Sequence, residues 1–270
     1  MAALITTANW ILPLLYLVLL IDYGTTFFLR TKTYARNPLL VVVIGLHALF
    51  LVLRGVHDGG PPIASGHEIL SIVAFSTALV YCMLELVVKD RRAGLFILLL
   101  VFLFQYTSSI FGGHRLDGIA QTDWARLHII PAVIAYTAFA IGAIYGALHL
   151  LAYRNLKHHS VGVFFDRLPP LDLLARMSWY AVLAGFAFMT ISIITGPMLV
   201  SHAGGAAPAS LWDPKIAVKI IAGGAAWLIY GTAIVGKFAG KWSSRTVSVI
   251  GVTGFAVTIV MIAASVVLAQ

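Results

Sequence analysis

Eight long apolar segments fill almost the whole of this 270-residue chain, and little sequence remains between them. A helix needs about 20 apolar residues to cross about 30 Å of hydrocarbon, and its backbone groups must bond within their own segment there. Each segment is therefore predicted to be a transmembrane helix, because a β-barrel would show short alternating stretches instead. We expect these helices over residues 9–29, 38–55, 67–88, 94–111, 125–153, 171–200, 215–235 and 246–269.

The composition supports the same class of protein. With 60% hydrophobic and 10% charged residues, the chain has too little polar surface to cover a water-soluble globule of its size. No linker or low-complexity tract separates the segments, so we predict an all-α, polytopic membrane helix bundle that forms a single transmembrane domain over residues 1–270. Paired half-repeats are not obvious, which argues against a transporter built on internal symmetry.

Basic residues gather in every second loop. They follow the first, third, fifth and seventh segments, as Arg30, Lys32 and Arg36; Lys89, Arg91 and Arg92; Arg154, Lys157 and Arg167; and Lys237, Lys241 and Arg245. Basic loops face the cytoplasm, so this pattern predicts a multi-pass protein of the cell inner (plasma) membrane with both termini outside. Topology thus accounts for most of the net charge of +8, and no nucleic acid is expected as a partner.

Four histidines are expected at the outer ends of four different helices. His67 opens the third segment, His128 lies in the first turn of the fifth, His202 follows the sixth, and His47 lies about two turns below the outer end of the second. Neutral imidazoles bind haem iron axially, so we predict a haem b site with ligands from this set. The alternative is that such histidines are hydrogen-bonding residues at the interface. The single cysteine, Cys82, excludes the covalent attachment of c-type haem.

Cations lie where the propionates of such a haem would need them. Arg54 is two turns after His47 on the same helix face, Arg126 precedes His128, and Lys215 and Lys219 share one face of the seventh segment. Two acidic residues, Asp22 and Glu85, lie toward the opposite ends of their helices. We expect them to pair with nearby basic residues, or else to form half of a proton path. Asp172 and Arg176 are spaced as a local ion pair.

Short motifs in the second half of the chain resemble the cytochrome c assembly family of haem-handling membrane proteins. They are Leu-Trp-Asp-Pro-Lys at 211–215, Leu127-His128 followed by Ala135-Tyr136, and Leu-Pro-Pro-Leu at 168–171, which looks like the smaller HemX-like branch. The resemblance covers roughly residues 125–235. It implies that His128 is an outer haem ligand and that Trp212 and Asp213 end a haem-presenting segment. No histidine follows Trp212, so His67 or His202 would have to complete the coordination.

The function that this resemblance implies is haem handling or delivery during cytochrome c maturation, with no bond-making chemistry of the protein's own. Its expected partners are haem, membrane lipid and other cytochrome c assembly proteins. Two alternatives stay open. One is a b-type electron-transfer subunit that passes electrons between quinone and a partner, and the other is a haem-free carrier. An absorbance spectrum distinguishes the carrier from the other two classes.

Overall fold

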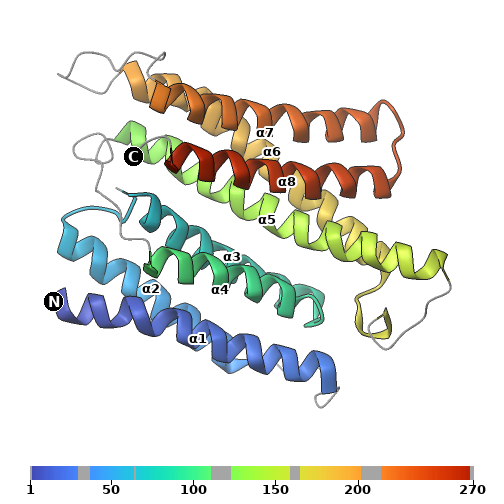
Figure 1. Cartoon of the computed structure of the whole chain (residues 1–270), viewed down its shortest axis with the longest axis horizontal. Coiled ribbons are helices and arrows are strands. Elements are labelled where there is room, and N and C mark those ends of the chain that lie inside the picture. The colour runs from blue at the N-terminus through green and yellow to red at the C-terminus, as the bar shows by residue number, and fades with distance from the viewer. Residues whose placement is uncertain are drawn as a thin grey trace. The chain divides into compact units, whose positions relative to one another are not determined.

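The computed structural model describes residues 2–29, 37–63, 65–110, 123–158, 165–201 and 214–267, and within these ranges it is helical with no strand. The helices are α1 (Ala2–Leu29), α2 (Pro38–Asp58), α3 (Gly66–Val88), α4 (Gly94–Ile110), α5 (Asp123–Lys157), the 3₁₀ helix η2 (Phe165–Arg167), α6 (Leu171–Ser201), α7 (Pro214–Phe238) and α8 (Ser244–Val267) (Figure 1). Seven are long and apolar enough to cross a membrane, and α4 is a shorter apolar helix of 17 residues. The predicted polytopic helical class is confirmed.

Local chemistry sets several helix boundaries. The side chain of Asn37 accepts the N–H of Leu39 and caps α2, while Pro38 occupies the first helical position, where its missing N–H costs nothing. The same helix ends at Gly59, whose φ of 72° is the left-handed conformation that glycine adopts freely. The sequence segments and the helices therefore end at nearly the same places wherever a cap is present.

Helices α1 and α5 extend furthest beyond the apolar segments that predict them. Helix α1 begins at Ala2 rather than near residue 9, and α5 extends over 35 residues to Lys157. A helix continues through polar residues such as Arg154 as long as no proline, glycine or cap stops it, whereas hydropathy ends with the last apolar residue. Because α5 begins at Asp123, His128 lies in its second turn rather than its first.

The chain divides into two compact units. Unit 1 consists of Met1–Gln121 with Arg167–Pro169, and unit 2 consists of Thr122–Asp166 with Pro170–Gln270. Unit 1 therefore contains α1 to α4, and unit 2 contains α5 to α8. This grouping does not test the single domain expected over residues 1–270, which stays a prediction.

In unit 1, α1 packs on α2 and α4, and α3 packs on the same two helices. Three of its largest fully buried side chains are the tyrosines Tyr16, Tyr23 and Tyr81. Gly94, the first residue of α4, makes room for two of them. A Cβ at this position would overlap the hydroxyl of Tyr81 and would lie 2.5 Å from the Tyr23 ring. The start of α4 can therefore approach these rings only because it carries no side chain.

The segment Arg167–Pro169 completes one end of unit 1. The guanidinium of Arg167 donates to the carbonyls of Phe27 and Phe28, which are among the last in α1 and lack partners within the helix. Arg92 donates to the carbonyl of Leu168 over 2.9 Å. Residues far apart in the sequence thus satisfy the end of α1.

In unit 2, α5 packs on α6 and α8, and α7 packs on the same two helices. The rings of Phe139 on α5 and Tyr230 on α7 are stacked at 3.6 Å with an angle of 2° between their planes. Two glycines one turn apart on α5 let the neighbouring helices come close. A Cβ at Gly142 would lie 3.3 Å from Ala181, and a Cβ at Gly146 would lie 3.1 Å from the hydroxyl of Ser178.

Candidate functional site

Helix α5 holds His128 against α6 through one ring nitrogen. His128 Nδ1 lies 2.9 Å from the carbonyl oxygen of Ser192, and the hydroxyl of the buried Ser192 lies 3.2 Å from the His128 carbonyl. A carbonyl only accepts, so Nδ1 carries the proton and Nε2 keeps its lone pair. Nε2 has no hydrogen-bond partner among the described residues. This tautomer is the one in which histidine binds a metal through Nε2, with its other nitrogen fixed by a carbonyl.

The backbone of α6 fits closely around this imidazole. Gly196 lies one turn beyond Ser192, and a Cβ there would approach His128 Cε1 to 3.4 Å. Thr195 donates its hydroxyl to the carbonyl of Leu127 over 3.3 Å. The ring is therefore positioned by main-chain atoms of a packed helix, which fixes its direction before any ligand arrives.

An aromatic pair lies close to the His128 anchor. Trp227 on α7 donates its indole N–H to the hydroxyl of Thr190 over 2.9 Å and stacks on Phe186 with ring centroids 5.3 Å apart. Thr190 precedes Ser192 by two residues, which is a rise of about 3 Å along α6. One turn before Trp227, a Cβ on Gly223 would meet none of the described atoms within 4 Å. The α7 backbone is therefore open to the approach of a flat group at this point.

His47 of unit 1 is fully buried, and both of its ring nitrogens are in hydrogen bonds. Nδ1 lies 2.9 Å from the hydroxyl of Tyr16, and Nε2 lies 3.1 Å from the hydroxyl of Ser71. Ser71 has one proton, which it donates to Oε1 of Gln105 over 2.9 Å. Ser71 must then accept from Nε2, and Nδ1 must accept from Tyr16.

The chain of hydrogen bonds from Tyr16 therefore has one direction, and it joins all four helices of unit 1. It continues from Gln105 Nε2 to the hydroxyl of Ser109 over 3.3 Å, and from that hydroxyl to the carbonyl of Asn9 over 2.7 Å. In this arrangement His47 has no lone pair left for iron. Its predicted role as a haem ligand, which nothing else in the structure tests, would require the loss of the bond from Tyr16.

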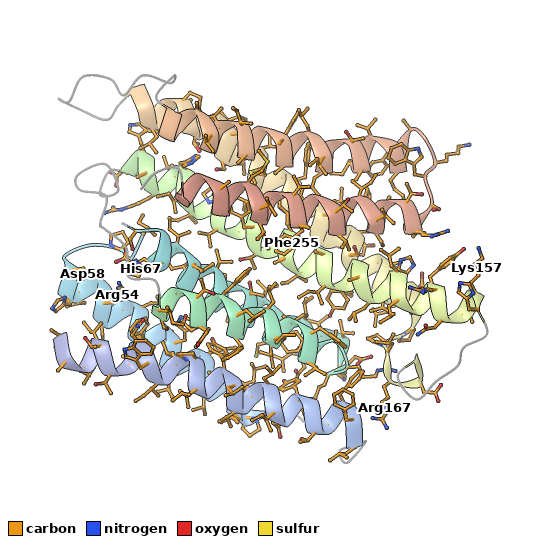
Figure 2. All side chains as sticks on the ribbon, viewed as in Figure 1. Arg54, Asp58, His67, Lys157, Arg167 and Phe255 are labelled. Atoms are coloured by element: carbon orange, nitrogen blue, oxygen red, sulfur yellow. The ribbon has the colours of Figure 1, made fainter. Side chains whose placement is uncertain are left out.

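His67 and Arg54 lie together, as Figure 2 shows with Asp58 beside them. Arg54 Nη2 is 2.5 Å from His67 Nε2, and because a guanidinium only donates, that nitrogen accepts. His67 Nδ1 is 2.8 Å from the hydroxyl of Ser65. The charge of Arg54 is balanced by Glu68 at 3.4 Å and Asp58 at 3.7 Å. The structure thus brings together a predicted ligand and a predicted propionate partner, but they bind each other.

The opposite end of unit 1 holds a buried carboxylate, Glu85. It accepts from the hydroxyls of Tyr23 at 2.5 Å and Tyr81 at 2.7 Å, and Arg91 lies 3.5 Å away. Arg91 also donates to Asp22 over 3.3 Å, which confirms the expected pairing of both acidic residues with a basic one. Burial lowers the pKa of Arg91, but its contacts with Tyr23, Glu85 and Asp22 outweigh this effect and raise the pKa above its ordinary value. The guanidinium is therefore charged at every physiological pH.

The remaining predicted site residues are Arg126, two lysines of α7 and three residues outside the described ranges. Arg126 is exposed and forms an ion pair with Asp123 at 3.0 Å. Lys215 and Lys219 lie on α7, but their side chains are outside the described part of the structure. His202, Trp212 and Asp213 also lie outside the described residues. Among the residues that are described, no three histidine, cysteine or carboxylate side chains converge as a metal site would require.

Several residues that define these sites carry no sequence signal of their own. Ser192 and Thr190 are single small polar residues within an apolar helix, and Gln105 of α4 is another. A buried polar residue in a membrane helix needs a partner, which is the one signal that could have singled them out. The identity of each partner depends on how a different helix is rotated about its axis, and that rotation cannot be read from the sequence.

Comparison with known proteins gives a consistent result. A family model described as Cytochrome C assembly protein matches residues 39–269. The chain is 23% identical to the cytochrome c biogenesis protein CcsA of Prochlorococcus marinus (strain MIT 9312), over 89% of this chain and 84% of that protein. It is also 23% identical to CcsA of Chlamydomonas reinhardtii, over 78% of this chain but only 60% of that longer protein. A protein HemX of Brevibacillus brevis is 27% identical over 70% of this chain and 72% of its own length.

The fold and the sequence together define a polytopic helical membrane protein with a preoriented imidazole on α5. The chain belongs to the cytochrome c assembly protein family, since the family model covers most of its length. The family predicted from the motifs at 127–128 and 211–215 is thereby confirmed.

Proposed function

We propose that this protein binds haem through His128 and handles haem, by transfer, storage or export, during cytochrome c maturation in the cell inner (plasma) membrane. The observation that carries the proposal is the bond from His128 Nδ1 to the Ser192 carbonyl, which leaves the Nε2 lone pair available to a metal. Membership of the cytochrome c assembly protein family supports the same function. Its partners in the proposal are haem and other cytochrome c assembly proteins.

The described residues of unit 2 fit a haem better than they fit a bare metal ion. An axial ligand needs one neutral imidazole, whereas a bare ion needs several converging ligands, which the described residues do not provide. The Trp227 and Phe186 pair and the open backbone at Gly223 suit a flat apolar ring. We propose haem b, because the only cysteine is Cys82 within α3 and no thioether attachment is possible.

His202 is our proposed second ligand. It follows directly on Ser201, the last residue of α6, and α6 is the helix that anchors His128. His67 was the other candidate, but its Nε2 lone pair accepts from Arg54 and would have to be released first. The cations expected near the propionates are Lys215 and Lys219, which follow Trp212 and Asp213 in the sequence. Arg126 and Arg54 are weaker candidates, because carboxylates already pair with both.

The first test compares haem content among histidine variants. We expect His128→Ala to lower haem binding about tenfold or more, because a ligand on a packed helix is preorganised. His57→Ala is the matched control, since that imidazole is 42% exposed near the end of α2 and pairs with the adjacent Asp58. The Soret absorbance of the purified membrane protein, titrated with haem, is the measurement. Equal retention of haem in the two variants would remove His128 from the site.

A second measurement separates haem handling from electron transfer. If the protein hands haem on, purified protein loaded with haem should lose its Soret band to an added apocytochrome. If the protein is an electron-transfer subunit, haem should stay bound and become reduced by quinol. Retention of haem with rapid reduction by quinol would contradict the proposed function, and a colourless protein would favour a haem-free carrier.

A further inference from the structure

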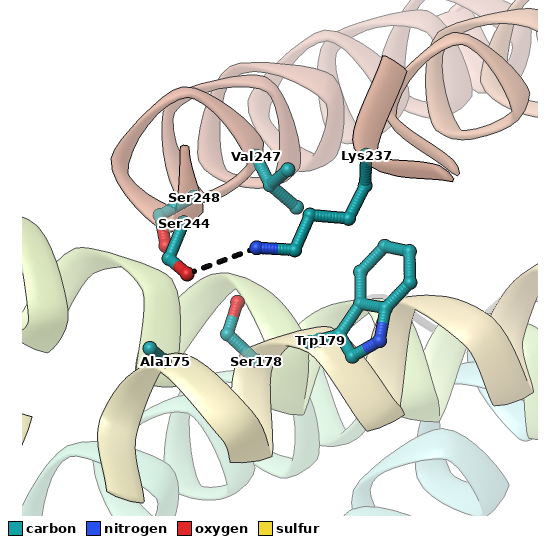
Figure 3. Close-up of a pocket in the computed structure, with 7 residues that line it drawn as sticks. All are labelled: Ala175, Ser178, Trp179, Lys237, Ser244, Val247 and Ser248. Atoms are coloured by element: carbon teal, nitrogen blue, oxygen red, sulfur yellow. Dashed lines mark hydrogen bonds between the residues drawn. The ribbon is translucent and has the colours of Figure 1, made fainter. Parts of the chain in front are cut away.

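The ends of three helices in unit 2 enclose a small polar cavity far along α6 from the His128 anchor. Ser178 and Trp179 of α6, Lys237 of α7 and Ser244 and Ser248 of α8 line it (Figure 3). Its volume is about 10 Å³, the space of about one water molecule, with the side chain of Lys237 lying across it. Ala175 and three serines line it, and their small side chains leave this space between the helices.

Two neighbouring groups in this cavity, Lys237 and Ser244, have hydrogen-bond donors to spare, whereas Ser178 donates to the Gly142 carbonyl and Ser248 bonds with His149. Lys237 Nζ donates to the hydroxyl of Ser244 over 3.1 Å, which leaves Ser244 its own proton to donate. No acceptor for that proton is found among the described residues. The ammonium group also has two protons left, and it forms no ion pair with any described carboxylate. Two adjacent groups therefore present free donors and one positive charge.

Nearby charges strengthen the preference for an anion. Lys241 and Arg245 flank the start of α8, and Arg245 lies over the Tyr153 ring, 5.1 Å from its centroid. The described carboxylate of Asp172 on α6 is held by Arg176 at 2.8 Å. The described charged residues that flank the start of α8 are therefore cationic.

The surface beside the cavity is apolar. Val235 and Phe238, on either side of Lys237 along α7, are 63% and 71% exposed, and the Phe238 ring contacts Trp179 with centroids 5.5 Å apart. In a membrane protein such side chains face the acyl chains of lipid, and tryptophan favours the level of the headgroups. An anion that binds Lys237 here is therefore best delivered by a molecule that also carries acyl chains.

We propose that the Lys237 cavity binds the phosphate of an anionic phospholipid. One phosphate oxygen takes the space of a single water and accepts from Lys237 Nζ and the Ser244 hydroxyl, while the acyl chains lie along Val235 and Phe238. Basic pockets between transmembrane helices recognise lipid headgroups in this way. The inference is independent of the proposed haem site, since it uses none of the residues assigned there.

The experiment titrates phosphatidylglycerol into the detergent-purified protein, with phosphatidylcholine as the neutral lipid, and follows bound lipid by native mass spectrometry. We expect Lys237→Gln to weaken phosphatidylglycerol binding about tenfold to a hundredfold, as the loss of a charge-assisted hydrogen bond predicts. Lys157→Gln is the control, because it removes the same type of cation from the exposed end of α5 without touching the cavity. We expect it to weaken binding less than about fivefold.

Two further measurements distinguish the proposal from its alternatives. Lys237→Arg should retain the preference for phosphatidylglycerol because it keeps the charge. If Lys237→Gln does not fold, Ser244→Ala replaces it and should also weaken binding, because it removes the second donor. Inorganic phosphate and glycerol 3-phosphate should compete poorly, since they lack acyl chains. Equal losses in Lys237→Gln and Lys157→Gln would overturn the proposal in favour of a general surface charge effect. Equally good competition by inorganic phosphate would overturn it in favour of a free phosphate site.

Discussion

At the scale of single residues, the two best described imidazoles have opposite hydrogen-bond states. His47 has a partner on each nitrogen and lies at 0% exposure, whereas His128 has its proton fixed and its second nitrogen unbonded among the described residues. A fully satisfied, buried polar group rigidifies a helix bundle, because breaking it leaves unpaired groups in a medium without water. We therefore infer a structural role for His47 in this arrangement.

Substitution of Tyr16 tests that role. Tyr16→Phe removes one hydrogen bond and should lower the free energy of unfolding by about 0.6 to 1.7 kcal/mol, the range found for such bonds in membranes. His47→Ala should cost about 2 to 5 kcal/mol, because it also leaves a cavity. Unfolding in graded sodium dodecyl sulfate gives both values. Haem content should stay unchanged in Tyr16→Phe; a gain of haem there would point back to His47 as a ligand, because the substitution frees the Nδ1 lone pair.

The sequence identified His47 as a costly buried residue but could not show what satisfies it. Tyr16 is 31 residues away and Ser71 is 24 residues away, so their meeting depends on how α1 and α3 are rotated about their axes. Tyr16 carries no signal of its own, because aromatic residues are common in such helices. For His128, by contrast, the Leu127-His128 motif directly indicated a functional residue. Nothing in the sequence indicated that Ser192 would hold its ring.

At the scale of helices, the turn between α3 and α4 is the tightest junction described in unit 1. Lys89 adopts a φ of 55° and ends α3, and Gly94 starts α4 against the rings of Tyr23 and Tyr81. Those rings cannot retreat easily, since both hydroxyls are bound to Glu85. The glycine is therefore required by packing and not by backbone conformation.

We predict that Gly94→Ala lowers the free energy of unfolding by about 1 to 3 kcal/mol, as overpacking of a fitted core does. Gly45→Ala in α2 is the control, because a Cβ there meets no atom within 4 Å. Alanine is the better helix former by about 1 kcal/mol, so the control should be neutral or stabilised. Thermal unfolding followed by circular dichroism measures both variants. Similar stabilities for the two would show that the rings move aside.

Most helices could be predicted from hydropathy alone, and the differences lie where hydropathy carries no signal. The segment 94–111 matches α4 (Gly94–Ile110) closely, because polar residues bound it on both sides. The segment 125–153 falls short of α5, because Arg154 and Lys157 are good helix formers that hydropathy does not count. The spacing of Asp172 and Arg176 correctly predicted an ion pair, since both residues lie on one helix and need no tertiary information.

At the scale of the whole molecule, the alternation of basic and neutral loops predicts the orientation in the membrane. Seven of the described helices are long and apolar enough to span a membrane, and the orientation itself stays a prediction. A reporter enzyme fused after Gln270 should be active only outside the cytoplasm, because eight crossings return the chain to the side on which it begins. Fusions after Lys157 should give the opposite result. Cytoplasmic activity of the fusion at Gln270 would contradict the predicted topology.

The bonds from Arg167 to the end of α1 have a consequence for biosynthesis. Arg167 is 140 residues beyond Phe27, so the ribosome must add all of those residues before the cap on α1 can form. At about 5 to 20 residues per second, this takes about 7 to 28 s. During that interval the last carbonyls of the first helix depend on water or lipid headgroups for their hydrogen bonds. The end of α1 is therefore completed only after the fifth helix has been synthesised.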